Sequence, residues 1–142
     1  DRTNGTYGTY VSTASNGGTT AFSSTTEVAS ISVTAVNDAP TYNPYSPTLN
    51  LTEDSAALTV TVASVLNGRM SDVDAGAVQG IAFTSISGSG GVLNYSIDGG
   101  STWLSSSVST SSALLLRSTD LVRFTPNGQN GGTTLLGFRA WD

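Results

Sequence analysis

The sequence contains no cysteine, no histidine and no lysine, so its five basic residues are all arginines. Without cysteine there can be no disulfide framework and no thiolate metal site. Without histidine, the usual general base and the usual zinc ligand are both missing. These absences exclude a histidine-based catalytic triad and a zinc hydrolase within this chain.

Basic charge and long apolar runs are also scarce. The formal net charge is -5 and the pI is about 4.2. A nucleic-acid partner needs a basic face, so we expect none. No apolar run approaches the ~20 residues of a membrane-spanning helix, so we expect no membrane insertion. A Ser/Thr-rich, lysine-free and cysteine-free β sequence is typical of a bacterial extracellular repeat, and the acidic balance suits a protein that binds cations.

What the chain does contain is a series of short strand-like segments separated by Gly, Asn and Ser turns. In residues 27–36 a polar face alternates with an apolar face, which predicts a half-buried strand. The apolar face consists of Ala29, Ile31, Val33 and Ala35. Further strands are expected at 57–62, 79–86, 92–95, 102–104, 121–125 and 134–141, with a buried segment at 113–116 and one or two helical turns within 63–70. So many short strands predict an all-β fold, an antiparallel β-sandwich with one short helical turn.

The chain has two parts with a joint between them. Residues 1–36 are too few to bury a core alone, although we expect aromatic and aliphatic anchors to be buried there. Those anchors are Tyr7, Tyr10, Val11 and Phe22. Residues 37–40 follow as a stiff joint, because Pro40 has a fixed φ and no N–H.

The second part, residues 41–142, ends on an apolar strand where a sandwich would take one or two more strands. We therefore expect residues 1–36 to be the C-terminal strands of a preceding repeat, and the sequence to be cropped out of phase from a tandem array. Asp142 would then overlay Asp1. Alternatively, residues 1–36 complete the open sandwich of a neighbouring copy by strand addition.

Several motifs occur in a fixed order along the chain. They are residues 36–40 (VNDAP), 52–54 (TED), 72–76 (DVDAG), 95–103 (YSIDGGSTW) and 138–142 (FRAWD). This set resembles the VNDAP-type cadherin-like tandem repeats of giant bacterial extracellular adhesins, which are RTX-like and often secreted by type I systems. The resemblance implies a cadherin-like or immunoglobulin-like sandwich.

The resemblance also implies Ca²⁺ at the joints between repeats. In the cadherin pattern the ligands come from the linker, from a DxD loop and from an Asp that ends a late strand. The corresponding residues are Asn37, Asp38, Asp72, Asp74 and Asp142, or the counterpart Asp1 in the preceding repeat, with Glu53 near the opposite pole. The linker lacks the first Asp of the cadherin linker, and only Asp120 approaches a DRE counterpart. The number of ions per joint therefore stays open.

The chemistry of residues 72–76 agrees with that implication. Ca²⁺ prefers six to eight oxygen ligands, and Asp72 and Asp74 at i and i+2 can point two carboxylates at one ion. Gly76 permits the turn. The alternative is that the loop is only a solvated acidic turn, and for Asp54 a solvated strand end or a cap is the better interpretation.

A second motif, residues 96–103, fits the Asp-box pattern SxDxGxTW. It predicts a hairpin in which Asp98 accepts backbone hydrogen bonds and Trp103 packs beneath. Aromatic side chains could instead form a sugar-stacking platform. The candidates are Trp103, Trp141, Tyr7, Tyr10, Tyr42 and Tyr45, of which Tyr42 and Tyr45 are expected to be the most exposed.

Together these features predict a structural repeat of an extracellular bacterial adhesin or surface fibre, stiffened by Ca²⁺ at its joints and extending or assembling into a filament. Its partners would be neighbouring copies of the same repeat, with a glycan possible at the tip of the array. We expect no enzyme, because Asp72 and Asp74 share one loop rather than opposing walls of a cleft. The alternative is a carbohydrate-binding β-sandwich module.

Overall fold

The computed structural model describes residues 6–46 and 48–142, and the chain divides into two compact units, Asp1–Ala35 and Val36–Asp142. The described part of the first unit contains no helix or strand. The strand predicted at 27–36 is therefore not formed, and Ile31 and Val33 are 93% and 92% exposed. The physical reason is that a strand needs a neighbour to take its N–H and C=O groups and a surface to cover its apolar face.

The predicted burial of the aromatic anchors in this unit is also wrong. Tyr7 is 87% exposed, Tyr10 is fully exposed and Val11 is 47% exposed, while Phe22 is half-buried. What the first unit does form is turns, including a Gly-rich one in which the Gly17 N–H donates to the Phe22 carbonyl at 2.8 Å. Turns alone give no second layer against which apolar side chains could pack.

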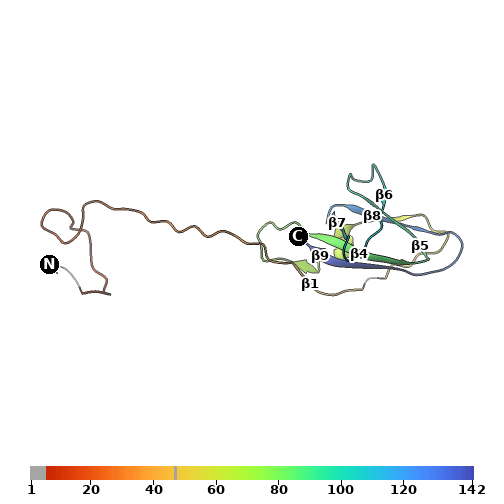
Figure 1. The fold of residues 1–142 in the computed structure, drawn as a ribbon, viewed down its shortest axis with the longest axis horizontal. Helices are drawn as coiled ribbons and strands as arrows, with labels where there is room; N and C mark the ends of the chain where they lie inside the picture. The colour runs from red at the N-terminus through yellow and green to blue at the C-terminus, as the bar shows by residue number, and fades with distance from the viewer. Residues whose placement is uncertain (1–5, 47) are drawn as a thin grey trace. The chain divides into compact units, whose positions relative to one another are not determined.

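The second unit is all-β with one short helix, as predicted (Figure 1). Its elements are β1 (Thr41–Tyr42), β2 (Leu58–Thr61), α1 (Val62–Leu66), β3 (Met70–Ser71), β4 (Gly80–Gly88), β5 (Gly91–Ser96), β6 (Leu104–Ser105), β7 (Leu114–Arg117), β8 (Leu121–Pro126) and β9 (Thr134–Trp141). They form sheets in the orders β1-β3, β2-β8-β5-β6 and β7-β4-β9, and all of these pairs are antiparallel. The fold is sandwich-like, with the two larger sheets enclosing one core.

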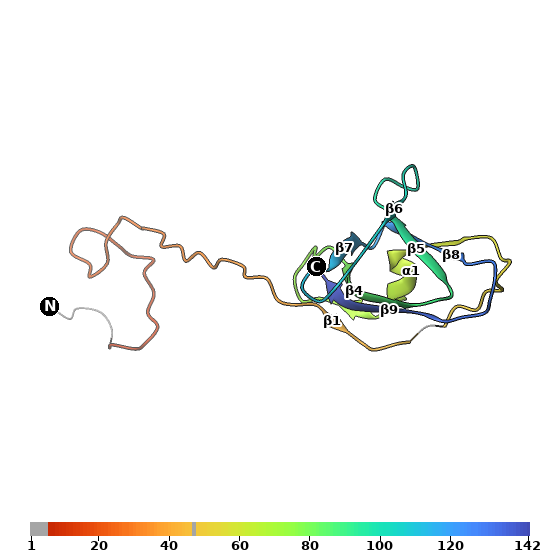
Figure 2. The same ribbon diagram turned by 45° about the vertical axis from the view of Figure 1, so that its right-hand side comes forward.

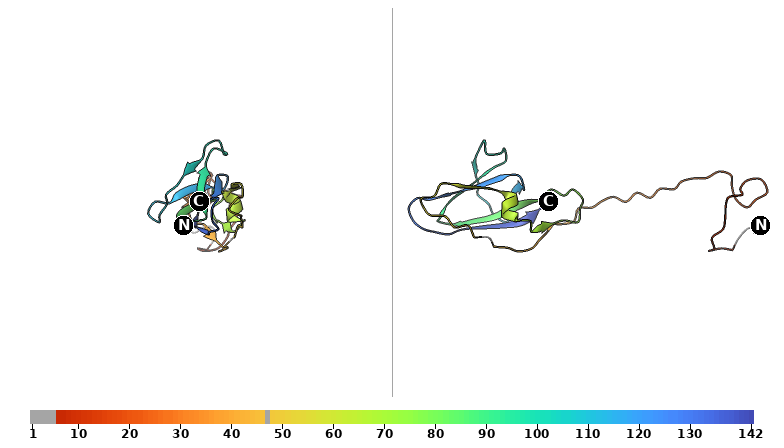
Figure 3. Two further views of the ribbon diagram at one scale, coloured as in Figure 1. Left: turned by 90° about the vertical axis from the view of Figure 1, so that its right-hand side faces the viewer. Right: turned by 180° about the vertical axis from the view of Figure 1, so that it is seen from behind.

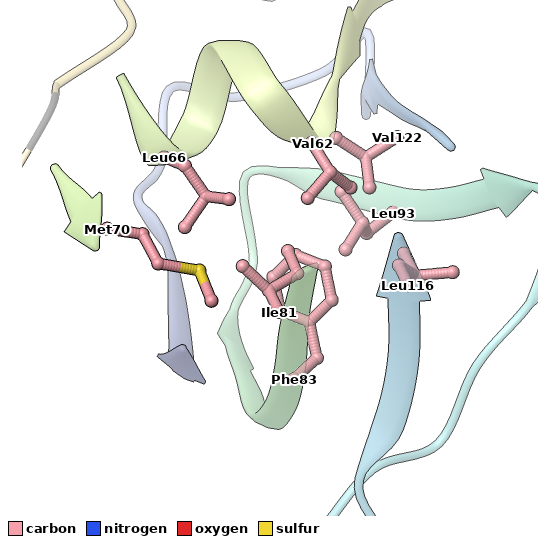
Figure 4. Packing of buried hydrophobic residues seen from close by; sticks show 8 residues of the cluster. All are labelled: Val62, Leu66, Met70, Ile81, Phe83, Leu93, Leu116 and Val122. Carbon is pink, nitrogen blue, oxygen red and sulfur yellow. The ribbon is translucent and has the colours of Figure 1, made fainter. Parts of the chain in front are cut away.

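Both larger sheets, β3 and α1 contribute to that core (Figure 4). The cluster comprises Val62, Leu66, Met70, Ile81, Phe83, Leu93, Leu116 and Val122. The expected burial of residues 113–116 is confirmed only for Leu116, since Leu115 is 49% exposed. Successive side chains of a strand point to opposite faces, and the outer face of β7 meets solvent.

The predicted helical turn is α1, seen beside the sheets in Figure 3. Thr61 caps it by accepting a hydrogen bond from the Ser64 N–H, and Asn67 ends it in the left-handed region at φ 50°. Val62 and Leu66 are four residues apart, so both point into the core. No helix of the described residues is long and apolar enough to cross a membrane.

Two strand pairs determine which residues meet at one end of the second unit. The pairing of β1 with β3 aligns Thr41 with Ser71, which places the residues before β1 beside those after β3. The pairing of β4 with β9 aligns Gly80 with Trp141. A Cβ at Gly80 would lie 2.5 Å from the Leu116 carbonyl oxygen and 2.7 Å from Cε3 of Trp141, so only glycine permits this close approach.

Candidate metal centre

Hydrogen bonds within the loop after β3 hold its backbone around the Asp72 carboxylate. Oδ1 of Asp72 accepts a 2.7 Å hydrogen bond from the Asp74 N–H, and the Asp74 carbonyl accepts one from the Ala77 N–H at 3.3 Å. Gly76 allows the chain to turn at φ 86°. These bonds fix the backbone of Asp74 relative to the side chain of Asp72.

The joint before β1 is attached to this loop. The backbone N–H of Asp38 donates a 2.8 Å hydrogen bond to Oδ2 of Asp74. At the start of β1, the hydroxyl of Thr41 lies 2.8 Å from the hydroxyl of Ser71. The joint and the acidic loop are therefore side by side, although they are far apart in the sequence.

Asp142 joins them because it follows directly after β9. One carboxylate oxygen from each of Asp72, Asp74 and Asp142 lies within 4.8 Å of the others, and all three side chains are partly buried. The second oxygen of Asp72, Oδ2, is shielded from solvent and has no hydrogen-bond partner among the described residues. A buried polar atom without a partner is rare, and this one belongs to a residue of the cluster.

Among the described residues, the side chains of the other predicted ligands are not part of this cluster. Asp38 is exposed and reaches the cluster through its N–H, and the side-chain amide of Asn37 donates to the Asp38 carbonyl at 3.3 Å. Glu53 is exposed in the turn of residues 52–55, outside the cluster, and the segment around it lies at the end of the unit away from the C-terminus (Figure 2). Asp1 lies outside the described residues.

The donor set of Asp72, Asp74 and Asp142 suits a hard divalent cation. All the ligand atoms are carboxylate oxygens, which Ca²⁺ and Mg²⁺ prefer over softer metals. Three carboxylates this close repel one another, and a divalent cation would replace that repulsion with attraction. Backbone carbonyls and water can complete a Ca²⁺ shell, because its coordination is flexible.

Asp120 has a different role. It is only 5% exposed, its Oδ1 accepts from Nη2 of Arg117 at 2.8 Å, and its Oδ2 accepts from the Arg117 N–H at 2.8 Å. This partner raises the pKa of the Arg117 guanidinium. Sequence reasoning missed this ion pair, although the spacing of Arg and Asp across a tight turn is a usable signal.

The hairpin of β5 and β6 confirms the structural interpretation of the Asp-box motif. Asp98 accepts hydrogen bonds from the Thr102 hydroxyl at 2.6 Å, the Thr102 N–H at 2.9 Å and the Ser96 hydroxyl at 2.8 Å. Chiefly through Thr102, these bonds lower the pKa of Asp98 to about 2. The Arg123 guanidinium lies 4.0 Å from the ring centroid of Trp103, so that ring packs against a cation.

The tyrosines after the joint are engaged within the unit. Tyr42 is half-buried and packs edge-on against Phe138 at 5.6 Å, so the expectation that it is exposed is wrong. Tyr45 is 42% exposed, and the Arg69 guanidinium lies 4.5 Å from its ring centroid. These two rings do not form an open flat platform.

The chain was compared with known proteins. No protein-family model matches it, and no curated protein or solved structure matches it significantly.

Proposed function

We propose that this chain is a structural repeat of an extracellular bacterial adhesin or surface fibre, and that Ca²⁺ stiffens it at the joint between repeats. The observation that carries the proposal is the convergence of Asp72, Asp74 and Asp142 beside the joint. The joint is attached to this cluster because the Asp38 N–H donates a hydrogen bond to the Asp74 carboxylate. The VNDAP resemblance supports the same assignment.

The proposed mechanism is mechanical. The cation would hold together the loop after β3, the end of β9 and, through Asp74, the residues that enter β1. Without it, the mutual repulsion of three carboxylates favours opening of this end of the sandwich. With it, the chain that enters the domain is fixed in direction relative to the sheets. A repeat with a fixed entry direction transmits force and keeps an array straight.

The class of site agrees with an extracellular location. Ca²⁺ sites of extracellular modules typically bind with a Kd of about 10⁻⁴–10⁻³ M, which matches a joint that is loaded outside the cell. The neighbours of each repeat would be further copies of the same repeat, with a glycan as a possible target at the tip of the array. The proposal includes no nucleic acid, no membrane insertion and no enzymatic activity.

The alternative, a carbohydrate-binding module, needs exposed aromatic rings that share one face. Tyr42 packs on Phe138, and Trp103 has Arg123 over its ring. The acidic convergence therefore favours the structural role over the sugar-binding role.

Isothermal titration of the chain with Ca²⁺ tests the proposal. We expect saturable binding with a Kd of about 10⁻⁴–10⁻³ M, which a variant carrying Asp72→Asn and Asp74→Asn loses. Equal heats for the variant and the unaltered chain would refute it.

A further inference from the structure

The outer edge of β9 is an open template for another strand. β9 is eight residues long and hydrogen-bonds to β4 on one side, and among the described residues no strand is bonded to its other side. The other edge strands of the larger sheets, β2, β6 and β7, have four residues or fewer. Natural sheets protect long edges with charges, prolines or cover, and β9 has a single charge, Arg139.

The core beneath this edge is incompletely covered. Leu136, Phe138 and Ala140 are the side chains of β9 that pack against the core, and all three remain only half-buried. On the neighbouring strand β4, Ile81 and Phe83 are fully buried. β1 approaches β9 through the contact between Tyr42 and Phe138, but its hydrogen bonds go to β3. An added strand would bury what β9 leaves exposed.

Residues 27–36 have the properties that such a strand requires. They form no helix or strand, and their apolar side chains are exposed, as with Ile31 at 93% and Val33 at 92%. Their length is similar to that of β9, and from Ala29 to Ala35 apolar residues alternate with Ser and Thr, which gives one apolar face and one polar face. An extended segment of this pattern adds main-chain hydrogen bonds through its backbone and specificity through alternate side chains.

We propose that residues 27–36 of a second copy of this chain add to the outer edge of β9 in an antiparallel sense, with Ile31 and Val33 facing the core. This inference rests on the proposed assembly of neighbouring copies and needs no cation. It names the two surfaces by which the copies join.

The direction of the strands favours a second copy over the chain's own segment. The chain enters the second unit at Asp38, whose N–H bonds to Asp74, and β9 ends beside the same residue, at Asp142. If residues 27–36 lay along their own β9, the pair would be parallel, whereas every pair of strands in the sheets is antiparallel. A second copy is not bound by this connection and can add in the antiparallel sense, which leads its joint to the far end of the acceptor. The contact is heterologous, so it joins copies head to tail in a series.

The association of the full chain tests this proposal. We expect sedimentation of the 142-residue chain to show a concentration-dependent series of oligomers in Ca²⁺ and in chelator alike. A variant with Ile31→Asp and Val33→Asp should remain monomeric. The matched control, Ser30→Asp with Ser32→Asp, adds the same charge to the outer face and should still associate. These substitutions lie outside the sandwich, so they leave its core unchanged.

Engineered cysteines can test whether the added strand is antiparallel or parallel to β9. The chain has no cysteine of its own, so each cross-link can be assigned to the introduced pair. Leu135 is exposed on the outer face of β9, the face that would align with Ser30 and Thr34. We expect Leu135→Cys with Thr34→Cys to give a ladder of cross-linked copies on a denaturing gel. A monomeric cross-link between Leu135→Cys and Ser30→Cys would show parallel closure within one chain and overturn the proposal. A chain that stays monomeric at all concentrations would also overturn it, while a Ca²⁺ titration that failed would bear only on the metal site.

Discussion

The backbone N–H of Asp38 and the carboxylate of Asp74 form a 2.8 Å hydrogen bond across 36 residues of sequence. This bond links the joint before the first strand to the loop that holds two of the three clustered carboxylates. Under the proposed function, cation binding at the acidic cluster is therefore coupled to the hydrogen bond that holds the joint. The predictions below follow from this link and from the contacts around it.

The first prediction concerns the affinity of the cluster for Ca²⁺. Replacing Asp72 with Asn removes one of the three negative charges of the proposed site, on the residue whose Oδ2 has no hydrogen-bond partner among the described residues. We expect the Kd measured by titration calorimetry to rise about tenfold, which corresponds to about 1.4 kcal/mol. Asp54→Asn is the matched control, because it removes the same charge from an exposed turn. An equal rise in the Kd of both variants would mean that Ca²⁺ is held by general electrostatic attraction and not at a specific site.

The second prediction concerns the order of the joint. Asp74→Ala removes the acceptor of the Asp38 N–H, so this amide should lose its protection against hydrogen exchange. Amides of β4 and β9 should keep theirs, because their ladder does not involve Asp74. Exchange followed by NMR at neutral pH measures both. Unchanged protection at Asp38 would mean that the bond to Asp74 does not hold the joint.

The third prediction concerns pH and the hairpin. Asp98 has a pKa of about 2 in the folded chain, below its ordinary value of 3.8, so its bonds to Thr102 and Ser96 stabilise the fold above about pH 4. This contribution falls as the pH drops through about 2. Urea denaturation should show Asp98→Asn less stable than the unaltered chain at pH 6, with the gap closing toward pH 2. A gap that is constant with pH would contradict the assignment.

The fourth prediction concerns the close approach at Gly80. An added Cβ would meet the Leu116 carbonyl oxygen and the Trp141 ring, so Gly80→Ala should destabilise the sandwich by about 1–3 kcal/mol. Trp141 directly precedes Asp142, so the same change should also weaken Ca²⁺ binding. Gly131→Ala is the control, because nothing lies within 4 Å of its Cβ position. Denaturant midpoints and titration of the two variants test both effects, and equal stability would show that β9 adjusts freely.

Local pattern was enough to predict most of the second unit. Alternation and turn residues located β2, β4, β8 and β9, and the cap and left-handed residue at the ends of α1 agree with the expected helical turn. The acidic loop was also predictable from the sequence, because Asp72 and Asp74 are separated by one residue and a glycine, Gly76, follows two residues later. That Asp142 meets them depends on the register of β9 against β4, which no local pattern specifies.

The failures have a common physical cause. Residues 27–36 carry a strand pattern, yet a strand depends on a partner and a core that the pattern does not supply. Tyr7 and Tyr10 were expected to be buried anchors of residues 1–36, but burial needs a second layer. Asp120 was considered only as an approximate counterpart of the DRE motif, and the structure instead pairs it with Arg117 across the turn between β7 and β8.

The most direct test of the calcium-stiffened joint is calorimetric melting of the chain with and without Ca²⁺. A ligand at ten times its Kd stabilises the folded state by about 1.4 kcal/mol. For a domain of this size we expect the Tm to rise by about 5–10 °C in Ca²⁺, and to fall back when chelator is added. The variant with Asp72→Asn and Asp74→Asn should show no rise. The same Tm with Ca²⁺ and with chelator for the unaltered chain would contradict the account.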